Sequence, residues 1–185
     1  MHRRFSILTL LPVIMISTLV QAVAAQTGCE GTSGSATING SPWSTMCVVG
    51  ATSTSCIDSL GMEYRCFQIV GSDSTSAYQT IAIFLAQEPV QGQTYSLGGG
   101  SGHGAMVGGQ SSLWVTGDAP YTGQVQVTLY DTAHSTIVCN FSFRAKSLFP
   151  GQDVSVTNGN FQGRLVAVEG KTWSDVKTLF RVSVD

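Results

Sequence analysis

A strict alternation of apolar and polar residues is the feature that most restricts how this chain can fold. Two neighbouring segments show it most clearly, separated by the letters DTAHS: Val125, Val127 and Leu129 in the first, and Ile137, Cys139, Phe141 and Phe143 in the second. In a strand, successive side chains point to opposite faces, so this period places the apolar residues of each segment together. The pattern predicts a β-hairpin whose two arms bury one apolar face.

Similar short segments recur along the rest of the chain. Strands are expected over residues 35–43, 46–49, 63–70, 78–86, 93–97, 112–116 and 153–166. The pair Asn39-Gly40 suits a type I′ hairpin turn, and the nearly continuous apolar run of 78–86 indicates a central strand. Residues 153–166 are expected to be hinged at Asn158-Gly159. For the last residues, one or two helical turns over 173–180 compete with a closing strand over 178–184, which we favour.

About nine short strands joined by glycine-rich turns predict an all-β fold, either an antiparallel β-sandwich or a partly closed β-barrel.

The N-terminus predicts export. Arg3 and Arg4 precede an uncharged apolar run over residues 5–20, and small residues follow at 22–25. This is the layout of a signal peptide, expected at 1–25, with one β-sandwich domain at 26–185. A retained anchor is the alternative, although the run is shorter than the ~20 residues that span a bilayer.

The charge of the chain argues against polyanionic partners. Of nine Lys and Arg, two lie in the leader, so seven remain against eleven Asp and Glu, a net charge of −4 with neutral His. Nucleic acids and anionic lipids are bound by clusters of Lys and Arg, and the sequence contains no such cluster. We therefore expect no nucleic-acid partner, and a membrane partner only if Cys29 carries a lipid.

Five cysteines lie beyond the predicted cleavage site, and in an exported chain they are expected to form disulfides. The chain has no CxxC pair and no histidine at ligand spacing, so no metal site is expected. Cys47 and Cys56 flank the turn-rich letters GATSTS, which predicts a bridge between them, and a second bridge is predicted between Cys66 and Cys139. Cys29 is then left over, free or lipidated. Other pairings remain open, because four cysteines already allow three.

Three segments resemble an uncharacterised family of exported β-domains found in Bacteroidota lipoproteins and secreted proteins. They are the run 123–165, the letters TINGSPWS at 37–44 and the letters QGQTYSLG at 91–98. One departure is that Val138, Cys139 and Asn140 stand where the family usually has a glycine before its F-x-F pair. The resemblance implies a β-rich exported fold and carries no known activity.

Candidate chemistry is sparse. The letters GSGHGA at 100–105 match a dinucleotide-binding pattern, but no helix is expected to follow them, so we predict a mobile loop carrying His103 and no cofactor. Asp131 and His134 share a hairpin tip, where they are either part of a catalytic or metal site or ordinary turn residues. We favour the turn, because no nucleophile is identifiable nearby. Trp43, Trp114 and Trp173 are expected in the core rather than as sugar platforms.

These observations favour an exported, noncatalytic β-domain that serves as an interaction or structural module of the cell envelope. The alternative is a β-barrel that binds a small apolar ligand in a cavity lined by Phe84, Trp114, Phe141 and Phe143. An enzyme using Asp131 and His134 is a third hypothesis. The expected location is secreted or periplasmic, with a membrane-anchored lipoprotein as the alternative.

Overall fold

The computed structural model describes residues 29–57, 63–73 and 78–166, which contain eleven strands and no helix. The strands are β1 (Ser33–Ile38), β2 (Ser41–Thr45), β3 (Val48–Ile57), β4 (Glu63–Ser72), β5 (Tyr78–Leu85), β6 (Thr94–Leu97), β7 (Gly104–Gly109), β8 (Leu113–Val115), β9 (Gly123–Asp131), β10 (Thr136–Ser147) and β11 (Val154–Val166). The predicted all-β class is confirmed. The predicted signal peptide, Trp173 and the segment 178–184 lie outside the described residues.

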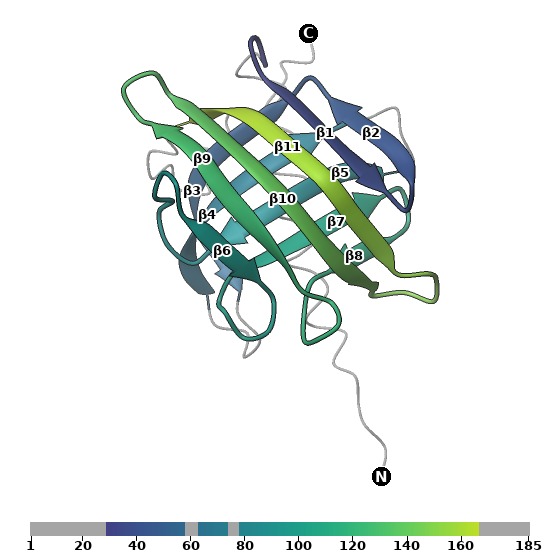
Figure 1. Ribbon diagram of the computed structural model, residues 1–185. Helices are drawn as coiled ribbons and strands as arrows, with labels where there is room; N and C mark the ends of the chain where they lie inside the picture. The colour runs from purple at the N-terminus through teal and green to yellow at the C-terminus, as the bar shows by residue number, and fades with distance from the viewer. Residues whose placement is uncertain (1–28, 58–62, 74–77, 167–185) are drawn as a thin grey trace, which may run out of the picture.

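The strands form one sheet that curls back on itself. Its order is β2-β1-β11-β3-β4-β5-β7-β8-β10-β9-β6, and an additional β10–β11 pairing closes a ring. Every pairing between described strands is antiparallel except that of β3 with β11. In Figure 1, β1, β11, β10 and β9 form a front layer that runs across β3, β4, β5 and β7 behind it. This arrangement fits the predicted sandwich or partly closed barrel.

Two hairpins follow directly from the sequence pattern. Asn39 and Gly40 both have positive φ, 48° and 82°, and connect β1 to β2, where Ile38 pairs with Ser41. A two-residue turn with positive φ at both positions is type I′, as predicted. The hairpin of β9 and β10 also forms, and β10 alternates between buried and outward residues along its length.

The turn-rich letters GATSTS were expected to reverse the chain, and this prediction is wrong. They lie inside β3, which runs without interruption from Val48 to Ile57 and pairs with β4. Gly50 packs without a Cβ against Ile137 and Phe67 of the core, so this glycine is a packing residue and not a turn residue. Small residues fit a strand buried on both faces as well as they fit a turn.

Two further expectations about glycine are corrected. The letters GSGHGA at 100–105 were predicted to be a mobile loop, but the last two of them, Gly104 and Ala105, begin β7, which pairs with both β5 and β8. Asn158-Gly159 was predicted to be a hinge, but both residues lie within β11. Asn158 has a φ of 51°, and the pairing with β10 shifts register here, so the feature is a β-bulge.

Phe161 lies at the centre of the core, between the two layers. Its ring centroid is 4.6 Å from that of Phe141 and 6.1 Å from that of Trp43. Trp43 is buried, and its indole N–H donates to the Tyr78 carbonyl oxygen at 2.6 Å, so it is the core residue that was predicted. Trp114 packs at the edge of the same cluster and is partly exposed.

Candidate interaction site

The structure pairs Cys29 with Cys47 and Cys56 with Cys66, and leaves Cys139 as a buried free thiol. The predicted Cys47–Cys56 bridge is therefore wrong. Cys56 lies near the far end of β3, and Cys47 directly precedes its start. Nine residues of extended chain span about 30 Å, far more than the ~7 Å between Cα atoms that a disulfide allows.

The predicted Cys66–Cys139 bridge is also wrong, because the two side chains lie on opposite faces of the sheet. Cys139 belongs to the core cluster between the layers, as do Phe67 and Ile69 of β4. Cys66 alternates with these two residues, and Gln68, on the same face as Cys66, donates to its sulfur. A period of two separates the faces of a strand, so Cys66 reaches Cys56 and not the core.

Cys29 is not the cysteine left over. Its sulfur is bonded to that of Cys47, and one sulfur does not carry both a disulfide and a lipid thioether. The cysteine without a partner is Cys139, whose pKa is raised to about 12 by burial. Two disulfides are consistent with an extracellular or periplasmic protein.

His103 is held in place, in contrast to the predicted mobile loop. Its Nδ1 accepts a hydrogen bond from the Ala86 backbone N–H at 3.0 Å, and its ring meets the Tyr95 ring edge-on at 5.2 Å between centroids. An accepting Nδ1 requires the neutral form with the proton on Nε2. Partial burial lowers the pKa of His103, in agreement with that form. The residue connects the glycine-rich stretch to the end of β5.

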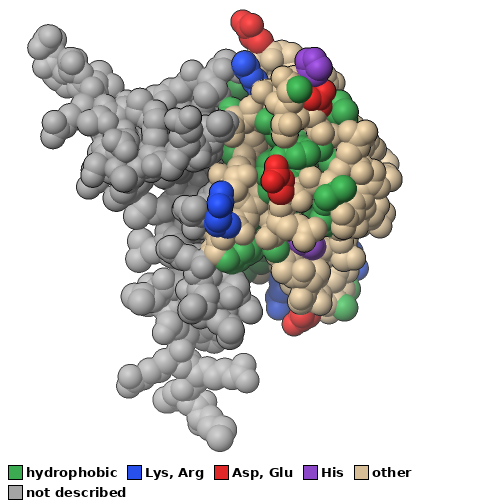
Figure 2. Space-filling view, turned by 90° about the vertical axis from the view of Figure 1, so that its left-hand side faces the viewer, with side chains coloured by type: hydrophobic (Ala, Val, Ile, Leu, Met, Phe, Trp, Pro, Cys, Tyr) green, Lys and Arg blue, Asp and Glu red, His purple; other side chains and the backbone are tan. Residues whose placement is uncertain are grey.

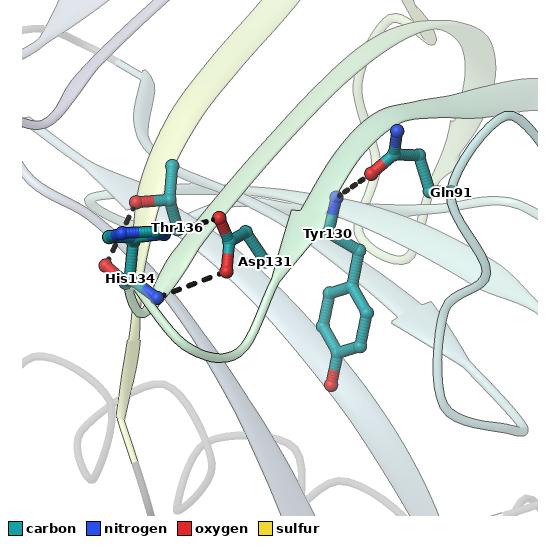
Figure 3. A network of polar contacts seen from close by, with 5 residues as sticks. All are labelled: Gln91, Tyr130, Asp131, His134 and Thr136. Atoms are coloured by element: carbon teal, nitrogen blue, oxygen red, sulfur yellow. Dashed lines mark hydrogen bonds and ion pairs between the residues drawn. The ribbon is translucent and has the colours of Figure 1, made fainter.

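Asp131 and His134 form the turn between β9 and β10, as favoured from the sequence (Figure 3). Asp131 accepts from the His134 backbone N–H at 3.0 Å and from the His134 Nδ1 at 2.6 Å. These two hydrogen bonds lower the pKa of the Asp131 carboxyl. The His134 side chain is 81% exposed, and the Thr136 hydroxyl donates to the His134 carbonyl rather than to its ring. The pair stabilises the turn.

Tyr130 lies beside this turn and ties it to residues 86–93. Its backbone N–H donates to Gln91 Oε1 at 3.4 Å (Figure 3), and its phenol donates to Glu88. Partial burial and then the hydrogen bond to Glu88 raise the pKa of the phenol. Its ring meets Phe67 edge-on at 5.8 Å between centroids. Within residues 29–57, 63–73 and 78–166, no cluster of His, Cys, Asp and Glu has the geometry of a metal site.

The loop between β10 and β11 exposes two large apolar side chains. Leu148 and Phe149 are neighbours there, and their exposed fractions are 45% and 39%. The loop is nevertheless fixed: the Leu148 N–H donates to the Leu113 carbonyl at 2.9 Å, and the Ser147 hydroxyl donates to the Phe149 carbonyl at 2.7 Å. Trp114 closes the far side of the loop, where its indole N–H donates to the Gln152 carbonyl at 2.7 Å.

Asp153 anchors the base of this loop. Its Oδ1 accepts from the Ser147 N–H at 3.2 Å, and its Oδ2 accepts from the Tyr121 phenol at 2.7 Å. The phenol and then the Ser147 N–H lower the pKa of Asp153. Lys146 lies over the Tyr121 ring, 5.9 Å from its centroid. We call Leu148 and Phe149, with the supporting Trp114, Tyr121 and Lys146, the apolar loop site.

Two other regions are less distinctive. A hollow of about 430 Å³ beside the Cys29–Cys47 bridge is open and mainly lined by short polar side chains around the exposed Met46. The apolar cavity predicted between Phe84, Trp114, Phe141 and Phe143 is not formed by those residues. Phe141 and Phe143 fill the core between the layers, whereas Phe84 packs against a separate cluster on the other face of β5.

The edge of the molecule seen in Figure 2 carries single charged side chains scattered among uncharged ones. The described part of the chain contains no helix that is long and apolar enough to cross a membrane. The described residues thus define an all-β protein with two disulfides and an exposed apolar loop that makes several hydrogen bonds.

Comparison of the chain with protein families, with curated proteins and with solved structures finds no match. The resemblance of residues 123–165 to exported β-domains therefore stays a prediction.

Proposed function

We propose that this protein is an exported, noncatalytic interaction module of the cell envelope, and that it contacts its partner through the apolar loop site. The observation that carries the proposal is the exposure of Leu148 and Phe149 on a loop that hydrogen bonds hold in one conformation. Exposed apolar side chains gain free energy when a partner buries them. A fixed loop loses little conformational entropy on binding, so more of that gain becomes affinity.

The chemistry around the loop describes the partner. Lys146 and Arg144 are exposed on β10, two and four residues before Leu148, while Asp153 is engaged by Tyr121. The complementary surface is an apolar recess with acidic groups on its rim. Two disulfides support a role outside the reducing cytoplasm, in a secreted or periplasmic location.

Photo-crosslinking in the cells that make the protein tests the proposal. A benzoylphenylalanine at position 149 is expected to capture one envelope protein, and the added change Leu148→Ser is expected to reduce that product severalfold. The same crosslinker at Val90, which is 54% exposed and distant in sequence, is the control. Equal products from positions 149 and 90, or a product that is insensitive to Leu148→Ser, would contradict the proposal.

A further inference from the structure

The Cys29–Cys47 bridge lies at the surface of the protein, beside an open hollow. Both cysteines are partly exposed, and both belong to the wall of this hollow of about 430 Å³, together with the exposed Met46. Thiol–disulfide exchange begins when a thiolate attacks one sulfur of a bridge, so its rate depends on access to that sulfur. The hollow gives a thiolate such access to the Cys29–Cys47 bridge.

The Cys56–Cys66 bridge has different surroundings. Cys56 lies in β3 and Cys66 in β4, two strands that pair with each other. The Gln68 amide donates to both sulfurs, at 3.6 Å each. A thiolate that approaches from this side must first displace the Gln68 side chain. Of the two bridges in the described residues, one is therefore open to a thiol and the other is shielded by a neighbouring side chain.

Hydrogen bonds hold the backbone around Cys47 independently of the bridge. The Cys47 N–H donates to Thr45 Oγ1 at 3.0 Å, and the Cys47 carbonyl accepts from the Ser72 N–H at 3.1 Å. In the segment before β1, the Thr32 hydroxyl donates to the Met46 carbonyl at 2.8 Å. Opening the bridge breaks none of these contacts, so the sheet is expected to stay folded when the bridge is reduced.

We propose that the Cys29–Cys47 bridge is a reversible exchange site for an exported dithiol protein. A thiolate of that partner bonds to the Cys29 sulfur, the Cys29–Cys47 bond breaks, and the Cys47 thiolate takes up the proton that the partner lost. The second thiol of the partner then loses its proton and attacks the mixed disulfide. This step releases Cys29, which takes up the proton, and leaves the partner with a disulfide. The dithiol is oxidised and the bridge is reduced by two electrons and two protons.

Cys29 is the sulfur attacked because it can move without the sheet. Cys47 is fixed by hydrogen bonds to residues of β2 and β4, whereas Cys29 lies four residues before the start of β1. A mixed disulfide at Cys29 therefore requires no strand to shift. Reduction releases residues 29–31 from their covalent link to the sheet. The exchange site is separate from the apolar loop site, and its reaction does not depend on the partner proposed there.

Graded reduction of the processed, exported chain tests the proposal. The folded protein is treated with dithiothreitol, quenched with iodoacetamide at intervals and mapped by peptide mass spectrometry. Cys29 and Cys47 should be alkylated about tenfold faster than Cys56 and Cys66, because accessible bridges are the labile ones. The buried thiol of Cys139 reports on folding and should stay unlabelled while Cys29 and Cys47 react. Equal rates for the two bridges, or labelling of Cys139 together with Cys29, would overturn the proposal.

A trapping experiment identifies the attacked sulfur. The probe is thioredoxin with its second active-site cysteine replaced by serine, so that a mixed disulfide persists. It should form an adduct at Cys29 of the natural chain. The matched control, Cys29→Ser with Cys47→Ser, should form no adduct and keep the Cys139 thiol unreactive. The proposal is wrong if the natural chain forms no adduct, if the adduct lies at Cys47, Cys56 or Cys66, or if the control exposes Cys139.

Discussion

Gly71→Ala should destabilise the protein strongly, because the Phe161 ring occupies the place of the missing Cβ. A Cβ built on Gly71 lies 2.7 Å from Phe161 Cε1, 2.8 Å from Phe161 Cζ and 3.1 Å from Trp43 Cη2. Contacts below 3.0 Å force a neighbour to move. The ring has no free direction, since Phe161 is fully buried and packs against both Trp43 and Phe141.

Overpacking of a fixed core costs about 1–3 kcal/mol of the free energy of unfolding. Urea unfolding with the disulfides intact measures this loss. A slope of about 2 kcal/mol per molar urea is typical for a domain of this size, so a loss of 2 kcal/mol lowers the midpoint by roughly 1 M. The matched control is Gly108→Ala in β7, where a Cβ meets only the Thr80 Cβ, at an ordinary 3.6 Å. This control should leave stability unchanged or raise it by up to about 1 kcal/mol.

A smaller side chain at position 161 should reduce the loss of stability caused by Gly71→Ala. Phe161→Leu destabilises on its own, but in that background Gly71→Ala should cost at least about 1 kcal/mol less than in the natural sequence, because residues in contact couple by about 0.5–3 kcal/mol. Two results would refute the contact between Gly71 and the Phe161 ring. One is a double variant whose loss of stability equals the sum of the two single losses, and the other is a Gly71→Ala variant as stable as the natural chain.

Two further predictions concern His103 and the cysteines. The pKa of His103 is lowered in the folded state, so the unfolded chain binds the proton more tightly, and stability should be full above the unfolded pKa of about 6.5 and fall as the pH drops below it. Urea midpoints at pH 7.5 and pH 5 should differ less for His103→Gln than for the natural chain, and an equal difference would rule out this contribution. For the cysteines, nonreducing peptide mapping should find the links Cys29–Cys47 and Cys56–Cys66. The Cys139 thiol, with its pKa near 12, should react with iodoacetamide at pH 8 only after unfolding, and rapid reaction in the folded protein would contradict its burial.

The fold class was predictable because it depends on local periodicity. Asn39-Gly40 determines its own turn, and the alternation in β10 needs only the residues of that strand. The predicted strand count of about nine was close to the eleven strands of the described residues for the same reason. Local patterns do not show which strands pair when they are far apart in the sequence, such as the parallel pair of β3 and β11.

The cysteine predictions failed through one local error. Placing a turn within the letters GATSTS hid the true length of β3 and brought Cys47 and Cys56 together. Gly50 was taken as a turn residue because glycine is common both in turns and in closely packed strands. The packing of Phe67 and Ile137 against Gly50, which shows that it belongs to a strand, depends on the tertiary structure. The alternation in β4 also places Cys66 and its neighbour Phe67 on opposite faces of the strand. Because Phe67 and Cys139 both face the core, this pattern argues against a bridge between Cys66 and Cys139.

The apolar loop site was missed although the sequence carries a signal for it. In the letters SLFPGQ at 147–152, two large apolar residues directly precede Pro150-Gly151, at a turn where polar residues are usual. The sequence does not reveal the hydrogen bonds from the Leu148 N–H to Leu113 and from the Trp114 indole to Gln152, because Leu113 and Trp114 belong to β8, far from the loop in the sequence.

The rest of the described surface supports the apolar loop site as the place where a partner binds. The outer face of the front layer is polar, with exposed residues such as Gln126 and Gln162. Among the described residues, neighbouring large apolar side chains are exposed at Leu148 and Phe149, whereas Met46 and Val90 are each separate from them in sequence. A partner that gains free energy by burying apolar side chains therefore has a pair of them to bury at this loop and single ones elsewhere. Leu148→Ser should accordingly weaken capture by a crosslinker at position 149 and leave any product at Val90 unchanged.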